Sequence, residues 1–338
     1  MPADGVLPPR FFSTTNLPTY LKMGDAWRRP RHPRMDCVIV LEDGDLTVRE
    51  PRDLKEGTLV AMGDAEDGSH GILVEHELVA DGRAETDAFK FMSTEVSRER
   101  PVDYEVLARL LVEERLRGGY ITWVVGPALV HARAREEVVW FIRHGYVSVF
   151  LSGNATAAHD IEAALYSTAL GITAAGEAVR HGHAHHIRAI NQIKTVGSIE
   201  QAVRDECITE GIMHALVTSD VPYVLAGSIR DDGPLPGVIT DAIEAQRAMR
   251  EHTQRTTFAL FLATALHSIA VGNMLPAYVD EGDEGVRPLH TICVDQTEFV
   301  VNKLRDRGTR QAHGVVTNVQ DFVHILRGYV EKCERLSD

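Results

Sequence analysis

The sequence has no long apolar run. No stretch of about 18 consecutive apolar residues occurs, so we expect no segment that spans a membrane. The N-terminal stretch MPADGVLPPRFF has no basic end followed by an apolar core, and we therefore do not interpret it as a secretory signal.

Positive charge is also scarce. The chain carries 35 Lys and Arg against 49 Asp and Glu, and its formal net charge is −14. An acidic chain repels phosphate backbones, so we expect no nucleic-acid partner. The four cysteines, Cys37, Cys207, Cys293 and Cys333, form no CxxC pair. Isolated cysteines of this kind indicate reduced thiols in a cytoplasmic protein, and nothing near them points to a catalytic thiol.

The composition that remains is that of a globular protein with a large core. The chain has 338 residues, of which 44% are apolar and 25% charged, enough for a large domain and a smaller one. Short β-rich runs such as MDCVIVLED and GTLVAMGD, separated by Gly-containing turns, predict a small β-rich domain over residues 1–95. A linking helix over 96–118 follows, and we expect an α/β domain over 119–338.

From residue 120 onward, apolar strands alternate with helical segments. Strands that are apolar throughout are typical of a parallel sheet covered by helices on both faces, so the predicted fold class is α/β with a mostly parallel sheet. The predicted strands are YITWVVG, VSVFLSG, PYVLAGS, FALFLAT, LHTICVD and HGVVTN. The predicted helices are 132–145, 155–170, 186–195, 198–206, 211–219, 238–252, 297–307 and 319–334.

Small and polar residues follow the predicted strands. Ligands of parallel sheets bind beyond the carboxyl ends of the strands, and Gly153 and Ala155 there allow a close approach to the backbone. The helix after Asn154 directs free N–H groups at the same crevice, which suits a phosphate, and Asp295 is placed to accept hydrogen bonds from ribose hydroxyls. The pattern predicts a nucleotide-sized ligand, although no GxGxxG follows a strand to name it.

Two further strand ends carry candidate chemistry. Arg230, Asp231 and Asp232 precede a rigid GPLPG turn, and they either bind a substrate ammonium and carboxylate or form a solvated, ion-paired turn. His267 follows an apolar strand and is either a proton carrier or a structural residue.

Four histidines, His181, His183, His185 and His186, lie within six residues in RHGHAHHIRAIN. The stretch is open to three interpretations: a metal site, a substrate pocket or a solvated loop. No acidic residue lies inside the cluster, and a metal site would need ligands from elsewhere in the chain. We expect no metal here.

At these residues the chain resembles the archaeal-type ornithine cyclodeaminases and the C-terminal module of cyanobacterial arginine dihydrolase/ornithine cyclodeaminase proteins. The resemblance lies in GPALVH, SGNATAAHDIEAALY, GHAHHIRAIN, LAGSIRDDGPLPGVITDAIEAQ, LHSIAVGNMLP and VDQTEFVVNKL, and before them in FFSTTNLPT, MDCVIVL and FKFMSTEVS. It covers nearly the whole chain from residue 11. One difference is that we expect the extra small N-terminal domain of the LOR/SDH-related type to be lacking, which leaves assembly and substrate open.

The resemblance implies an NAD-binding domain similar to that of deoxyhypusine synthase, and a lyase of arginine and ornithine metabolism. It implies a redox-neutral conversion of L-ornithine to L-proline, in proline biosynthesis. Cα gives up hydride to form an α-imine, the δ-amine attacks, ammonia leaves, and hydride returns. It also implies an amino-acid substrate as partner and a homo-oligomer, either a dimer or a tetramer.

Site residues follow from the matching motifs. The resemblance places NAD on Gly126, Pro127, Ala128, Ser152, Gly153, Asn154, Ala155 and Asp295, with Thr264 and Asn273 on the nicotinamide side. It makes Asp231 or Asp232 the amine partner or base, His267 the proton carrier and Arg230 the carboxylate clamp. His185, His186, Arg188 and Asn191 are the expected substrate-pocket residues.

Three alternatives stay open. The first is a related NAD-dependent enzyme acting on another diamino acid or amine. The second is a non-catalytic NAD-binding module. The third is a metal hydrolase built on residues 181–186.

Overall fold

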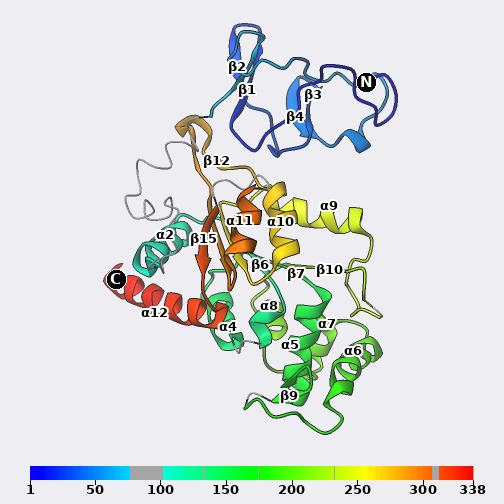
Figure 1. Ribbon diagram of the computed structural model, residues 1–338, viewed down its shortest axis with the longest axis vertical. Coiled ribbons are helices and arrows are strands. Elements are labelled where there is room, and N and C mark those ends of the chain that lie inside the picture. Colours follow the sequence, from blue (N-terminus) through cyan, green and yellow to red (C-terminus); the bar gives the residue numbers. More distant parts are fainter. Residues whose placement is uncertain (77–101, 132–133, 174, 232, 307–311, 338) are drawn as a thin grey trace. The chain divides into compact units, whose positions relative to one another are not determined.

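The computed structural model describes residues 1–76, 102–131, 134–173, 175–231, 233–306 and 312–337. Contacts between residues divide the chain into two compact units (Figure 1). The first contains Met1–Arg100, Ile269–His290 and Leu304–Gln311, and the second contains the rest.

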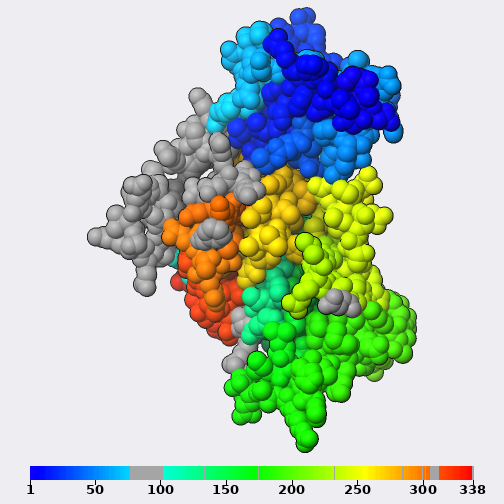
Figure 2. Space-filling model, turned by 45° about the vertical axis from the view of Figure 1, so that its right-hand side comes forward, coloured from blue at the N-terminus to red at the C-terminus, as the bar shows by residue number. Residues whose placement is uncertain are grey.

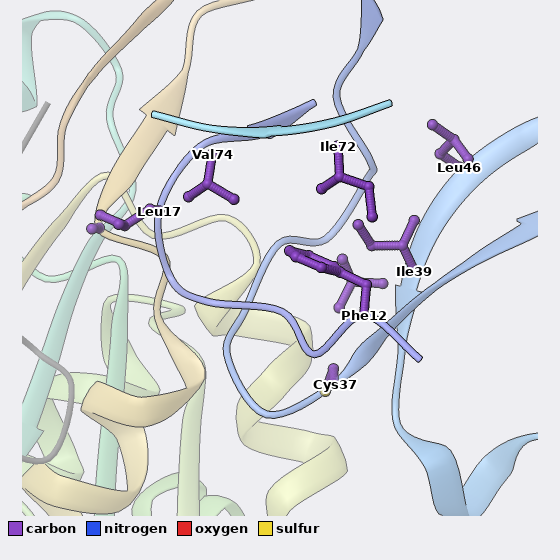
Figure 3. Close-up of a cluster of buried hydrophobic side chains, with 9 residues drawn as sticks. Phe12, Leu17, Cys37, Ile39, Leu46, Ile72 and Val74 are labelled. Carbon is purple, nitrogen blue, oxygen red and sulfur yellow. The ribbon is translucent and has the colours of Figure 1, made fainter. Parts of the chain in front are cut away.

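The first unit is β-rich, as the sequence predicts for its N-terminal part. Its strands are β1 (Thr19–Met23), β2 (Ala26–Arg28), β3 (Val38–Glu42), β4 (Asp45–Arg49), β5 (Ile72–Val74), β12 (Tyr278–Asp280) and β13 (Val286–Pro288). β2, β1 and β5 form an antiparallel sheet, while β3–β4 and β12–β13 are antiparallel pairs. Figure 3 shows a core of apolar side chains that point toward one another, among them Phe12, Ile39 and Ile72.

One predicted strand of this unit is wrong. The segment GTLVAMGD forms only isolated bridges, from Val60 to Val40 and from Met62 to Phe11. Its apolar residues follow one another as in a strand, but it meets a different neighbour at each bridge, and no continuous ladder forms.

The second unit contains a six-stranded sheet in the order β10-β7-β6-β11-β14-β15. Its strands are β6 (Ile121–Val125), β7 (Val149–Gly153), β10 (Tyr223–Ala226), β11 (Phe258–Leu262), β14 (His290–Asp295) and β15 (Ala312–Val316). The strand pairs are parallel. β6 and β11 are buried along their whole length, which explains their uniformly apolar sequence. The α/β prediction with a parallel sheet is confirmed.

Helices connect these strands and cover both faces of the sheet. They are α2 (Tyr104–Leu116), α3 (Ala128–His131), α4 (Arg135–Arg143), α5 (Asn154–Tyr166), α6 (His185–Val196), α7 (Ile199–Arg204), α8 (Ile212–Thr218), α9 (Ala242–Thr253), α10 (Ala265–Met274), α11 (Glu298–Asp306) and α12 (Val319–Ser337). α4, α5 and α8 lie on one side of the sheet and α9 on the other (Figure 1). The connections from β6 to β7 and from β7 to β10 run one way across the sheet, and the connection from β10 to β11 runs back the other way. Right-handed crossovers in opposite directions put helices on opposite faces.

Two helices, α3 and α10, lie where the sequence shows only connections. The helix predicted over 155–170 ends earlier than expected, at Tyr166, because Ser167 adopts a left-handed conformation that caps it. The residues that follow form a short hairpin of β8 (Thr168–Ala169) and β9 (Ile172–Thr173). In the space-filling view the green surface belongs to the part of the second unit that contains α5, β8, β9 and α6 (Figure 2).

The described residues contain no disulfide, and Cys37 and Cys293 are buried. Burial raises the pKa of the Cys293 thiol to about 12, which makes it a poor nucleophile. In the part of the chain that the structure describes, we find no helix with the length and apolar character of a membrane span.

Candidate functional site

The candidate site lies at the carboxyl edge of the parallel sheet. β7 and β10 lie on one side of β6, and β11, β14 and β15 lie on the other. The chain thus reverses its direction across the sheet between β6 and β11, which is the position where open α/β sheets bind ligands.

Gly126 joins the turns that follow these two central strands. Its N–H donates to the carbonyl of Leu262 at 3.0 Å. A Cβ at this position would lie 2.1 Å from the carbonyl oxygen of Ala263 and 2.8 Å from Cβ of Thr264. Only glycine fits here, and Pro127 and Ala128 then lead into α3. The predicted residues Gly126 and Thr264 are therefore brought together.

The loop after β7 leads into the first turn of α5, whose side chains are buried or half-buried. The hydroxyl of Ser152 donates to the carbonyl of Val125 at 2.6 Å, and Gly153 begins the helix in an extended conformation without a side-chain cap. By contrast, Asp241 caps α9 through the N–H groups of Ile243 and Glu244. The first N–H groups of α5, including that of Ala155, therefore have no side-chain acceptor at Gly153.

His267 lies over this loop. A Cβ on Gly153 would be 3.0 Å from Cε1 of His267, so the glycine leaves room for the ring. Burial lowers the pKa of His267, and its imidazole is consequently neutral at pH 7. A neutral imidazole at the carboxyl edge of the sheet is able to accept a proton.

Asn154 links the loop after β7 to the loop after β10. Its Nδ2 donates to Oδ1 of Asp231 at 3.2 Å, and its Oδ1 accepts the N–H of Leu235 at 3.0 Å. The other carboxylate oxygen of Asp231 accepts the N–H of Ser228 at 2.6 Å. Asp231 is half-buried, and these two hydrogen bonds hold its carboxylate in place. Arg230 beside it is exposed, while Asp232 lies outside the described residues.

The other predicted cofactor residues are placed as follows. Asp295 ends β14, and its Oδ1 accepts both the N–H and the hydroxyl of Thr297 at 3.0 Å. Asn273 lies on α10, and its Oδ1 is buried without a hydrogen-bond partner among the described residues. Asn273 belongs to the first unit and Asp295 to the second.

The four predicted substrate residues lie at different places on α6. His185 stacks on Tyr166 with ring centroids 4.7 Å apart. Arg188 and Asn191 line a shallow cavity of about 430 Å³ together with Tyr166. His186 instead packs against His159 of α5, with ring centroids 4.6 Å apart.

Glu162 is a buried residue that the sequence analysis missed. It is fully buried on α5, and it accepts hydrogen bonds from Nδ1 of His159 at 3.2 Å, Oγ1 of Thr168 at 3.0 Å and the N–H groups of Leu170 at 3.1 Å and Gly171 at 2.8 Å. Burial alone would raise the pKa of Glu162, but these hydrogen bonds outweigh it and lower the pKa. The carboxylate is therefore ionised at neutral pH.

His159 lies at the centre of a cluster of imidazoles. Its ring centroid is 4.6 Å from that of His131 and 4.6 Å from that of His186. Burial lowers the pKa of both neighbours, whereas the charge of Asp231 opposes this at His186. The negative charge of Asp231, the predicted ammonium-binding residue, therefore acts on this cluster. The available signal was His159 and Glu162 one turn apart in a helix rich in small and apolar residues.

Comparisons with known proteins agree with this architecture. Residues 105–326 match the family described as arginine dihydrolase ArgZ-like, C-terminal, Rossmann fold. Residues 18–106 match the first region of the same C-terminal part.

Among curated proteins, the chain is 45% identical to an ornithine cyclodeaminase of Methanopyrus kandleri, covering 100% of this chain and 78% of that protein. It is 39% identical to the bifunctional arginine dihydrolase/ornithine cyclodeaminase AgrE of Nostoc sp., of which it covers 46%.

Among solved structures, a conserved LOR/SDH protein of Methanococcus maripaludis S2 matches with a TM-score of 0.86 and 39% identity, over 98% of this chain and 97% of the other. A ternary complex of AgrE with ornithine and NAD⁺ matches with a TM-score of 0.63 and 35% identity, over 98% of this chain and 45% of the other. The chain therefore belongs to the family that the archaeal ornithine cyclodeaminases form with the C-terminal regions of the ArgZ-like arginine dihydrolases.

Proposed function

We propose that this protein is an NAD-dependent ornithine cyclodeaminase. It converts L-ornithine to L-proline and ammonia without net oxidation. The proposal is supported by the family, whose archaeal members carry this name, and by a related structure that holds ornithine and NAD⁺. The observation that supports it for this chain is the Asn154–Asp231 hydrogen bond, since it holds the carboxylate that we assign to the substrate ammonium beside the first turn of α5.

The residues at the sheet edge fit a dinucleotide. The first turn of α5 offers N–H groups to a pyrophosphate, and the Cβ-free positions Gly126 and Gly153 allow a ligand close to the backbone. We assign the loops at residues 126–128 and 152–155 to NAD, Asp295 to a ribose hydroxyl and Thr264 to the nicotinamide side. Asn273, which belongs to the first unit, stays a prediction from the resemblance. The cofactor supplies reversible removal of hydride from Cα of the substrate.

The remaining residues handle charge and protons. Asp231 binds a substrate ammonium through a charge-assisted hydrogen bond, and Arg230 binds the carboxylate. Neutral His267 accepts a proton from the substrate and leaves an amine that is able to attack. Hydride leaves Cα with both bonding electrons and an imine results. The δ-amine adds to this imine, and the α-nitrogen departs as ammonia. Hydride then returns to Cα and gives proline.

The proposal is tested by incubating the purified protein with NAD⁺ and either L-ornithine, L-lysine or 2,4-diaminobutyrate. We expect ammonia and proline from ornithine. Asp231→Asn should reduce kcat/KM, while Asp220→Asn, at an exposed position, should not. Turnover of another diamino acid alone would change the substrate, and NAD⁺ binding without any ammonia would favour the non-catalytic module.

We further propose that the enzyme is a homo-oligomer, a dimer or a tetramer, that serves proline formation in the cytoplasm. The support is the family resemblance. Light scattering of the purified protein measures the assembly directly.

A further inference from the structure

We propose that His159, Glu162 and His186 form a binding site for a divalent transition metal ion of the zinc class. The three side chains come from α5 and α6, and one donor atom from each lies within 4.8 Å of the other two. The proposal concerns metal binding alone and does not depend on the proposed reaction.

The donor set has the right chemistry. Two imidazoles and one carboxylate, with further positions left open, are a ligand set used for zinc and related ions. His159 and Glu162 are three residues apart on one helix and share a face. Their Nδ1 and Oε2 atoms are 3.2 Å apart, close to the ~3.4 Å between two ligands of one tetrahedral ion with bonds of about 2.1 Å.

The carboxylate is already held in place. Thr168 and Gly171 donate to Oε1 of Glu162, and Leu170 donates to Oε2. Partners of this kind orient the ligands of protein metal sites. Three acceptor positions are thereby filled from the β8–β9 hairpin, and the remaining one is directed at His159.

His186 provides a second, independent observation. Its Nδ1 is buried and has no hydrogen-bond partner among the described residues, although a buried polar atom without a partner is unfavourable. A metal ion bound by the cluster would give His186 the partner that it lacks. The negative charge of Asp231 also acts on His186 and favours a bound cation.

This site also revises the metal interpretation of the histidine stretch. The stretch itself holds no acidic ligand. The structure supplies one from α5, together with a second histidine, and uses only His186 from the stretch. The exposed residues His181 and His183 are not part of the site.

The experiment uses the full chain without an affinity tag, stripped with a chelator and then dialysed against Zn²⁺ or Co²⁺. We expect about one ion per chain by elemental mass spectrometry and a tetrahedral Co²⁺ absorption band. His186→Ala should abolish stoichiometric binding, the matched variant His183→Ala should retain it, and Thr168→Val should weaken the affinity by about 10-fold.

Either of two results overturns the proposal: no stoichiometric metal in the wild-type chain, or equal binding by the His186→Ala and His183→Ala variants. The first result would assign a shared proton, not a metal ion, to the His159–Glu162 pair. The wild-type measurements need no variant, so they decide the matter even if a substitution prevents folding. Circular dichroism of each variant separates loss of metal from loss of fold.

Discussion

Helix α5 carries two buried carboxylates with different surroundings. Asp160 and Glu162 are only two residues apart, and both are fully buried. Asp160 accepts a hydrogen bond from Nε of Arg135 at 2.7 Å and another from the N–H of Met213 at 2.8 Å. It therefore neutralises a guanidinium of α4 and holds the start of α8.

Glu162 receives its hydrogen bonds from an imidazole, a hydroxyl and backbone N–H groups. Its charge is stabilised by dipoles and not by an adjacent guanidinium, so it keeps an attraction for a cation. One side of α5 thus packs against neighbouring helices. The other side carries Asn154, His159 and Glu162, the residues of the proposed cofactor and metal sites. Burial alone does not distinguish a structural carboxylate from a functional one, whereas the charge of its partners does.

The largest expected effect lies on the structural side. Asp160→Asn leaves Arg135, whose side chain is 15% exposed, beside a neutral amide. Breaking a buried ion pair costs about 3–5 kcal/mol of unfolding free energy. We expect the low end, because Glu210 remains 3.6 Å from Arg135. Urea denaturation measures the loss. Glu210→Gln, at an exposed position, should cost less than about 1 kcal/mol, and equal losses in the two variants would contradict the comparison.

His267 gives the next largest effect, on the functional side. Because burial lowers the pKa of His267, this residue binds a proton less readily in the folded chain than in the unfolded chain. The stability from this group is therefore present above about pH 6.5 and lost as pH falls. His267→Gln should reduce kcat by about 100-fold and remove the acidic limb of the pH profile. A variant with the wild-type rate would make His267 a structural residue.

The sequence was sufficient to predict the sheet and one grouping at its edge. The strands are uniformly apolar because both faces are covered. Parallel strands end at one edge, which is why residues after different strands, such as Asn154 and Asp231, lie close together. The histidine cluster was not predicted, because it depends on how α6 packs against α5. His159 and Glu162 looked like ordinary residues of a helix, and only tertiary contacts make them neighbours of His186.

Glu162→Gln sharpens the contrast with Asp160. Glutamine keeps an oxygen for some of the loop N–H groups but turns an amide donor toward the others. We expect a loss of about 1–2 kcal/mol in unfolding free energy, smaller than for Asp160→Asn, together with loss of metal binding. Denaturation and metal analysis of the same preparation test both parts. A stability loss larger than that of Asp160→Asn would reverse the assignment of the two sides.

Gly126→Ala gives the smallest effect on function that we predict. The added methyl group would meet the carbonyl of Ala263 at 2.1 Å, so the turns after β6 and β11 must separate. We expect NAD⁺ affinity to fall by about tenfold, or ~1.4 kcal/mol, measured by calorimetry. Gly328→Ala on α12, where a Cβ meets nothing within 4 Å, is the matched control and should leave the affinity unchanged.

The most direct test of the proposed reaction follows labelled atoms. L-ornithine with deuterium at Cα and ¹⁵N at the α-amine is converted by the purified protein with NAD⁺, and the products are analysed by mass spectrometry. Hydride that leaves Cα and returns to it predicts proline that keeps the deuterium and has lost the ¹⁵N to ammonia. Proline that retains ¹⁵N, or that has lost the deuterium to water, would contradict the account.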